Sequence, residues 1–191
     1  MGKVFDPDDL HAIAKAAVGL DTTEAACTQI VAELKRKYPD HIHDDIPCLF
    51  NNAGGAMGQM KFLHCSLSEY LILFGTPIGT EGHSGRYTAE VWDFIFAGEI
   101  WGYGEGELER QVFKPGEFHH LGSGRAEGYK IPDTGSFMLE YARGPILSMM
   151  AFGLADTIFS TLDVRVTAKT ARHTLGLMLG ELRKRKSLTR A

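Results

Sequence analysis

The chain has 191 residues, of which 44% are hydrophobic and 23% charged, and its net charge is -4. This predicts one globular domain with a sizeable core, and the acidic balance excludes the basic surface expected of a nucleic-acid-binding protein. The three cysteines, Cys27, Cys48 and Cys65, have no paired spacing, so we expect free thiols in a reducing compartment. The first residues do not resemble a signal peptide, and no apolar run reaches the ~18 residues of a membrane span.

Helix-start signals open the chain. Asp6-Pro7 combines a capping side chain with a proline suited to the first helical turn, which predicts a helix to about residue 18. Thr22 or Thr23 caps a second helix to about residue 37, where Tyr38-Pro39 ends it. The stretch NNAGGA, residues 51–56, predicts a turn or a close backbone approach. Residues 1–50 are therefore expected to form a helical N-terminal part.

Residues 57–142 have the pattern of an antiparallel barrel or sandwich. Apolar and aromatic runs alternate there with glycine-rich breaks such as GTPIGTEGHSG, GYGEGE and PDTG. Short runs separated by turn residues are typical of strands in all-β architectures. The candidate strands are 57–65, 69–75, 86–98, 110–114, 117–121, 126–131 and 136–142.

From Pro145 the helical period returns and predicts two C-terminal helices within 145–186. Residues 146–155, ILSMMAFGLA, are apolar all round but too few to span a bilayer, which indicates a core helix or an interfacial one. The last helix, about 162–186, is amphipathic and ends in the basic run RKRK. Its apolar face either packs on the barrel or lies on a membrane, with basic residues on a neighbouring face. That apolar face consists of Val164, Ala168, Ala171, Leu175, Met178, Leu179 and Leu182, and the basic residues are Arg165, Lys169 and Arg172.

One carboxylate stands inside a hydrophobic run, FMLEYARG, residues 137–144. In a strand, Glu140 shares a face with Met138, while the larger apolar residues of the run share the other face. If that other face is the core wall, Glu140 faces solvent as a strand-end carboxylate paired with Arg143 or another base. If the barrel has a lumen, Glu140 faces the lumen, where burying a lone charge is costly.

The strand TAEVWDFIFAG, residues 88–98, carries two more acids on opposite faces. Asp93 shares a face with Val91, so Glu90 and Asp93 cannot both enter one cavity unless a bulge intervenes. Two acids in one apolar cavity share a proton at neutral pH, because burial and mutual repulsion raise the pKa of one of them. Such a pair supports acid–base chemistry without a cofactor. The sequence leaves open which of the two acids faces inward.

The histidines offer a metal-centred alternative. The segment PGEFHH, residues 115–120, resembles the second metal motif of cupin barrels, and His83 lies upstream. A metal site of this kind needs an H-x-H pair, whereas His83 stands alone, and His119 and His120 point to opposite faces of a strand. We therefore expect no metal and no cofactor, and we expect His64 to be a hydrogen-bonded core residue.

Long motifs over nearly the whole chain resemble the sterol isomerase and sigma receptor family. The opening VFDPDDLHAIAKAA and KYPDHI are similar to its fungal-type isomerase branch. The other motifs are NNAGGAMG (51–58), HCSLSEYLILFGTPIGTEGHSGRY (64–87), FKPGE (113–117), LEYARG (139–144) and FGLADTIFSTLD (152–163).

This resemblance implies an α+β fold, in which a cupin-like antiparallel β-barrel carries N-terminal helices and two C-terminal membrane-associated helices. It also implies a homotrimer at the endoplasmic reticulum membrane. The isomerase branch implies a cofactor-independent enzyme of ergosterol-type sterol biosynthesis that moves a ring double bond from the delta-8 to the delta-7 position. The receptor branch implies a non-catalytic protein that binds lipophilic amines.

The resemblance also assigns roles to residues. Glu140 matches the family's essential glutamate. Asp93 matches the aspartate that pairs with it in the receptor branch, whereas fungal isomerases carry an acid at the Glu90 position, so both remain candidate partners. Asp156 is expected to cap a helix or bond locally. The residues that match pocket-lining positions for a sterol or a lipophilic amine, each of which could equally be an ordinary core residue, are Met60, Tyr70, Ile72, Phe74, Tyr87, Val91, Met149 and Met150.

Overall fold

The computed structural model describes residues 3–188, with side chains described as far as residue 184. The side chains of Arg185 and Lys186, in the predicted basic run, lie outside this part. The helices are α1 (Pro7–Ala16), α2 (Thr23–Lys37), α3 (Ile146–Phe159) and α4 (Val164–Leu188). The strands are β1 (Leu49–Ala53), β2 (Ala56–Cys65), β3 (Glu69–Thr76), β4 (Thr80–His83), β5 (Glu90–Gly98), β6 (Ile100–Gly104), β7 (Gln111–Phe113), β8 (Phe118–Leu121), β9 (Glu127–Ile131) and β10 (Ser136–Arg143).

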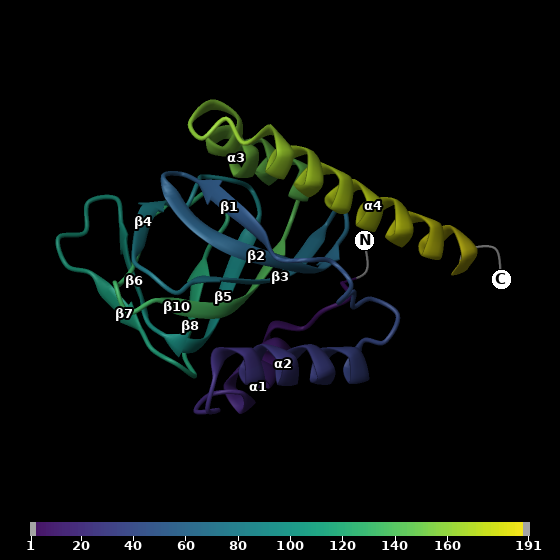
Figure 1. Ribbon diagram of the computed structural model, residues 1–191, viewed down its shortest axis with the longest axis horizontal. Coiled ribbons are helices and arrows are strands. Elements are labelled where there is room, and N and C mark those ends of the chain that lie inside the picture. The colour runs from purple at the N-terminus through teal and green to yellow at the C-terminus, as the bar shows by residue number, and fades with distance from the viewer. Residues whose placement is uncertain (1–2, 189–191) are drawn as a thin grey trace.

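The strands form two antiparallel sheets, in the orders β1-β2-β3-β10-β5-β8 and β4-β9-β6-β7. Figure 1 shows these strands as a barrel-like body, with α1 and α2 on one side and α3 and α4 on another. The predicted α+β class, with an antiparallel barrel between N-terminal and C-terminal helices, is confirmed.

The predicted helix starts are confirmed because their capping bonds form. The Asp6 carboxylate accepts hydrogen bonds from the backbone N–H groups of Asp8 and Asp9, at 2.9 and 3.4 Å. The Thr22 hydroxyl accepts one from the backbone N–H of Ala25 at 3.1 Å. Such caps satisfy N–H groups that have no partner within the helix. The first helix ends at residue 16, two residues before the predicted end.

Three strands were not predicted, because each lies in a segment rich in turn residues. β1 includes Asn51 and Asn52 of the NNAGGA stretch, where only the two glycines form the turn. β4 and β6 lie within or next to glycine-rich breaks. The predicted strand 86–98 begins at Glu90, four residues later than expected.

The large sheet separates two hydrophobic cores. On its outer face, Leu139 and Tyr141 are fully buried with residues of α1 and α2 such as Leu10 and Ile30. Its inner face faces the smaller sheet, with Ile72 and Met138 among the buried residues there. The opposite face of β10 is a core wall, yet Glu140 faces the interior of the barrel, so the alternative in which Glu140 faces solvent is wrong and the alternative of a lumen is confirmed.

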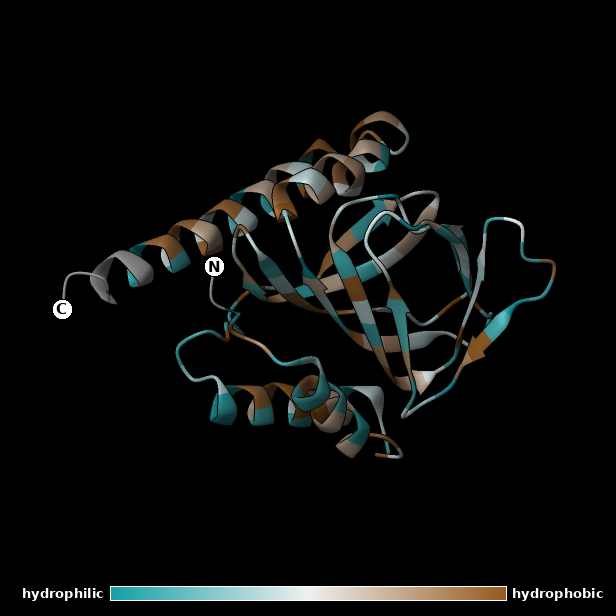
Figure 2. Cartoon of the chain, turned by 180° about the vertical axis from the view of Figure 1, so that it is seen from behind, coloured by the Kyte–Doolittle hydropathy of each residue, from teal (hydrophilic) through white to brown (hydrophobic). Residues whose placement is uncertain are grey.

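Helix α4 packs against the barrel with a face that hydrophobicity does not predict. Its buried residues are Thr170, Thr174, Leu177, Met178 and Glu181. Of the predicted apolar face, Val164, Leu175 and Leu179 are more than half exposed. Figure 2 shows hydrophobic positions along α3 and alternating with hydrophilic ones along α4. Among the described residues, no helix combines the length and apolar character that crossing a bilayer requires.

Candidate active site

A cavity of about 200 Å³ lies between the two sheets, under α3 and α4. Its wall is mostly apolar and includes aromatic residues of both sheets. All eight residues predicted to line a pocket lie on this cavity: Met60, Tyr70, Ile72, Phe74, Tyr87, Val91, Met149 and Met150. Alternation explains the common orientation of Tyr70, Ile72 and Phe74 on β3, and likewise that of Val91 on β5, since every second side chain of a strand faces the same side.

Glu140 and Asp93 lie side by side on the inner face of the large sheet and both line the cavity. They are direct cross-strand partners in the pairing of β10 with β5. Side chains at directly opposed positions of an antiparallel pair have Cβ atoms only ~5 Å apart. The Tyr70 hydroxyl on β3 donates a short hydrogen bond to Glu140 Oε1. The structure therefore brings the two predicted acids together in one apolar chamber.

The chamber favours the neutral form of Glu140. Burial, followed by the negative charge of Asp93, raises the pKa of Glu140 from its ordinary 4.5 to about 8, although the hydrogen bond from Tyr70 opposes this shift. Burial and the adjacent Glu140 raise the pKa of Tyr70 well above its usual value, so its phenol stays protonated. Glu140 thus holds a proton at neutral pH beside a second carboxylate.

His119 extends the acid pair to the smaller sheet. It stands opposite Asp93 in the pairing of β5 with β8, and its Nδ1 lies 3.0 Å from Asp93 Oδ2. Its Nε2 lies 2.8 Å from Glu127 Oε2 on β9. Burial alone would lower the pKa of His119, but the hydrogen bonds to Asp93 and Glu127 outweigh burial and raise it to about 9. Protonated His119 can then donate to both carboxylates.

Glu90 is not part of this site, and its place among the candidate catalytic residues is wrong. The one irregularity of the β10–β5 pairing lies between Phe137 and Met138, away from Glu90, so no bulge turns its side chain inward. Glu90 Oε2 instead accepts a hydrogen bond from Arg143 at 2.6 Å, on the outer face. Arg143 therefore pairs with Glu90 and not with Glu140.

Several cavity residues were not predicted. Tyr129, Trp101 and Phe113 come from the smaller sheet, and the alternation within the predicted strand 126–131 is the signal that could have suggested Tyr129. Glu127 was also missed, because its contact with His119 joins two sheets.

Asp156 does not act locally as expected: its Oδ2 accepts a hydrogen bond at 2.6 Å from the backbone N–H of Gly55, in the β1–β2 turn.

Three of the four ring nitrogens of His83 and His119, the histidines that line the cavity, are engaged by protein groups. His119 uses both nitrogens on carboxylates, and Nδ1 of His83 accepts a hydrogen bond from the backbone N–H of Gly85 at 2.9 Å. His120 faces outward and stacks on Trp92 with ring centroids 4.5 Å apart. As predicted, only one of the adjacent pair His119 and His120 enters the lumen.

Two solved structures resemble about half of this chain, both at low sequence identity. The cupin domain of Schizosaccharomyces pombe Cnp3 has a TM-score of 0.42 and 12% identity, over 49% of this chain and 69% of that one. A predicted oxalate decarboxylase from Thermotoga maritima has a TM-score of 0.45 and 16% identity, over 54% of this chain and 97% of that one.

Relatives in sequence are much closer. The C-8 sterol isomerase of Pyricularia oryzae is 46% identical over 188 residues, which cover 93% of this chain and 84% of that protein. The C-8 sterol isomerase of Gibberella zeae is 47% identical, over 94% and 75% of the two chains. The sigma non-opioid intracellular receptor 1 of Gallus gallus is 42% identical, over 92% and 79%. Residues 2–186 match the family described as ERG2 and Sigma1 receptor like protein, and the chain belongs to that family.

Proposed function

We propose that the protein is a sterol isomerase that moves a ring double bond from the delta-8 to the delta-7 position without a cofactor. The observation that carries this proposal is the Glu140–Asp93 pair inside an apolar cavity, with Glu140 protonated at neutral pH. The C-8 sterol isomerases at 44–47% identity support the choice of reaction.

The reaction begins with proton transfer from Glu140 to one carbon of the ring alkene. The π electrons form the new C–H bond, and the neighbouring carbon becomes a tertiary cation. Asp93 lies close enough to stabilise this cation electrostatically, and the aromatic faces of Tyr70 and Phe74 add cation–π attraction. Alkenes are poor bases, so the apolar wall matters: it keeps the acid neutral and keeps water from trapping the cation.

Loss of a proton from the ring carbon on the other side of the cation completes the shift. A carboxylate of the pair accepts that proton, and the C–H electrons form the new double bond. One proton enters and one leaves, so the reaction needs no oxidant and no reductant. Because Glu140 and Asp93 are adjacent, the proton returns to Glu140 within the pair, and the starting state is restored.

We further propose that α3 and α4 lie on a membrane and that the apolar substrate enters the cavity from the membrane at these helices. Where α3 ends and α4 begins, Phe159, Leu162 and Val164 are 81%, 71% and 74% exposed. Exposed basic residues, Arg165 and Lys169 among them, follow on α4, as expected of an interfacial helix near anionic lipid. On their inner side the same two helices line the cavity.

Vesicle flotation tests this membrane contact. We expect the protein to float with vesicles that contain anionic lipid, and we expect Phe159→Asp with Leu162→Asp to remain unbound. Leu108→Asp is a matched control, since Leu108 is 99% exposed in the β6–β7 connection. Equal flotation of all three proteins would contradict the contact.

The homotrimer and the endoplasmic reticulum membrane complete the proposal and are supported by the family resemblance. Light scattering in detergent would test the trimer, and microscopy of a tagged chain would test the location. A monomer in detergent would contradict the trimer and leave the isomerase proposal intact.

The alternative is a non-catalytic protein that binds lipophilic amines. The 42–43% identity to sigma non-opioid intracellular receptor 1 of three vertebrates favours this alternative, and a buried carboxylate pair also suits an ammonium group. Incubating purified protein with a delta-8 sterol separates the two functions. Formation of the delta-7 isomer establishes the enzyme, whereas amine binding without product establishes the alternative.

A further inference from the structure

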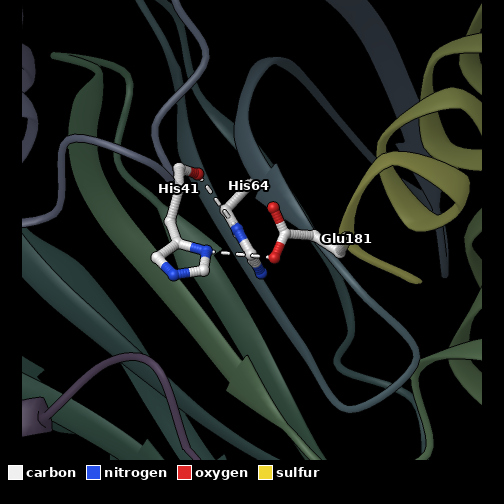
Figure 3. A group of neighbouring side chains, drawn as sticks. All are labelled: His41, His64 and Glu181. Carbon is white, nitrogen blue, oxygen red and sulfur yellow. Dashed lines mark hydrogen bonds and ion pairs between the residues drawn. The ribbon is translucent and has the colours of Figure 1, made fainter. Parts of the chain in front are cut away.

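A second group of ionisable side chains lies outside the cavity, where α4 crosses the barrel. His41 belongs to the turn after α2, His64 to β2 and Glu181 to α4 (Figure 3). One possible ligand atom from each residue lies within 4.8 Å of the others. His64 and Glu181 are 0% and 3% exposed, whereas the His41 side chain is 32% exposed. The acid–base pair of the cavity makes no use of this group.

Hydrogen bonding fixes how His64 presents its ring. Its Nδ1 lies 3.0 Å from the backbone carbonyl oxygen of His41, which can only accept, so Nδ1 carries a proton and donates. Its Nε2 is buried and has no hydrogen-bond partner among the described residues. A buried polar atom without a partner costs stability, and a buried imidazolium without a partner costs more. The Nε2 atom therefore carries a bare lone pair.

This arrangement of His64 is typical of metal ligands. Histidines that bind a metal through one nitrogen usually donate the other N–H to a carbonyl or carboxylate. The expectation that His64 is a fully hydrogen-bonded core residue is accordingly wrong for one of its two nitrogens.

Glu181 supplies an anion whose two oxygens have different partners. Its Oε1 accepts a hydrogen bond at 2.7 Å from Lys184, which also donates to the backbone carbonyl of Asp40. Its Oε2 lies 3.0 Å from Nδ1 of His41. A metal ion can take the place of the proton between these two atoms. His41 then releases that proton or carries it on its other ring nitrogen, Nε2.

We propose that His41, His64 and Glu181 form a binding site for a divalent transition metal ion, with Zn²⁺ as its simplest occupant, that fastens α4 to the barrel. Two imidazole nitrogens and one carboxylate oxygen are a donor set that Zn²⁺ commonly takes, and solvent can fill the fourth position. Tetrahedral ligands at ~2.0–2.1 Å from the ion stand ~3.4 Å apart, so atoms now within 4.8 Å of one another must draw together by at most ~1.4 Å. The exposed edge of His41 gives the ion a path inward.

Titration of the full chain, without a histidine tag and after treatment with chelator, tests the site with Zn²⁺ as the probe. We expect calorimetry to show saturable binding of one ion per chain and Zn²⁺ to raise the melting temperature. Co²⁺ should give the visible absorption of a tetrahedral site with nitrogen and oxygen ligands. His41→Gln should weaken binding at least tenfold and remove the thermal shift, and Glu181→Gln should do the same.

His173→Gln is the matched control, because it removes a partly buried histidine that lies on α4 but does not belong to the group. This variant should bind Zn²⁺ as the wild type does. His41 lies on an accessible turn, so His41→Gln should fold even if changes at buried His64 or Glu181 do not. No saturable uptake by the wild type would overturn the proposal, as would equal uptake by the wild type and His41→Gln. Neither result bears on isomerase activity, which needs no metal in the proposed mechanism.

Discussion

Strands β5 and β10 carry two cross-strand pairs of ionisable residues, three positions apart and on opposite faces of one sheet. On the inner face Glu140 opposes Asp93, and on the outer face Arg143 opposes Glu90. On the outer face, Arg143 Nη2 lies 2.6 Å from Glu90 Oε2, and this hydrogen bond lowers the pKa of Glu90. Inside, two acids meet and the pKa of Glu140 rises.

A single pair of strands therefore lowers the pKa of the carboxyl group on one face and raises the pKa of the one on the other. The outer pair follows the ordinary rule that a partly buried charge has a partner of opposite sign. On the inner face Asp93 also has such a partner, protonated His119, but Glu140 breaks the rule: its buried neighbour is another acid, and the raised pKa of Glu140 makes the folded state less stable at neutral pH. This destabilisation occurs on the inner face and is avoided on the outer one. It therefore indicates that the inner face carries the function.

The largest expected effect comes from removing the inner acid. Glu140→Gln keeps the shape of the side chain but removes the proton donor, so conversion of a delta-8 sterol should fall by about 10³-fold or more. Turnover assays on purified protein measure this loss. Glu90→Gln is the matched control on the outer face and should stay within about twofold of the wild type. Equal losses in both variants would remove the distinction between the faces.

Asp93→Asn should have the next largest effect. Its amide cannot offset the charge of the cation or accept a proton, so turnover should fall by about 10²-fold. Circular dichroism should show an unchanged fold, because the amide can still bond to His119. Turnover above half of the wild-type rate would mean that Asp93 is a neighbour of the acid and not its partner.

The two faces of this sheet also show how much of the site can be predicted from the sequence. Alternation placed Glu140 opposite the apolar face of its strand, and the resemblance identified it as the essential acid. The choice between Asp93 and Glu90 needed the register of β5 against β10, which depends on contacts between segments about 45 residues apart. His119 was considered as a metal ligand, but its link to Glu127 joins two sheets and leaves no local pattern.

Local signals similarly predicted the helices better than the strands. Asp6-Pro7 and Thr22 act within one helical turn, so both starts were correct. Strands β1, β4 and β6 are short and polar or glycine-containing, and pairing with neighbours stabilises them more than their own residues do. Helix α4 buries Thr170 and Glu181 while exposing Leu175, which no preference based on hydrophobicity predicts.

The pH dependence of turnover should also differ between changes on the two faces. Glu140 donates its proton only while protonated, so the rate should fall about tenfold per pH unit once the pH exceeds about 8. Binding of a permanently charged lipophilic ammonium should strengthen over the same range, since ionised Glu140 attracts it. Glu90→Gln should leave both profiles unchanged. Turnover that stays constant to pH 10 would contradict Glu140 as the acid.

The smallest expected effects are on stability, and they have opposite signs on the two faces. The folded pKa of Glu140 lies above its ordinary 4.5, so the folded state keeps a proton that the unfolded chain releases, and stability falls as the pH rises from 4.5 to about 8. Glu140→Gln avoids this loss and should gain about 1–3 kcal/mol at pH 8, with little change at pH 4.5.

The contribution of the outer pair to stability should change with pH in the opposite direction. The folded pKa of Glu90 is lowered, so its contribution to stability is present above its ordinary value of 4.5 and is lost as the pH falls through the folded value. Glu90→Gln should therefore cost about 0.2–1 kcal/mol at pH 8. Urea unfolding of both variants at pH 8 measures the two signs. A Glu140→Gln variant less stable than the wild type would show that the bond from Tyr70 outweighs burial and the repulsion from Asp93, and the inner carboxylate would then be a structural element like the outer one.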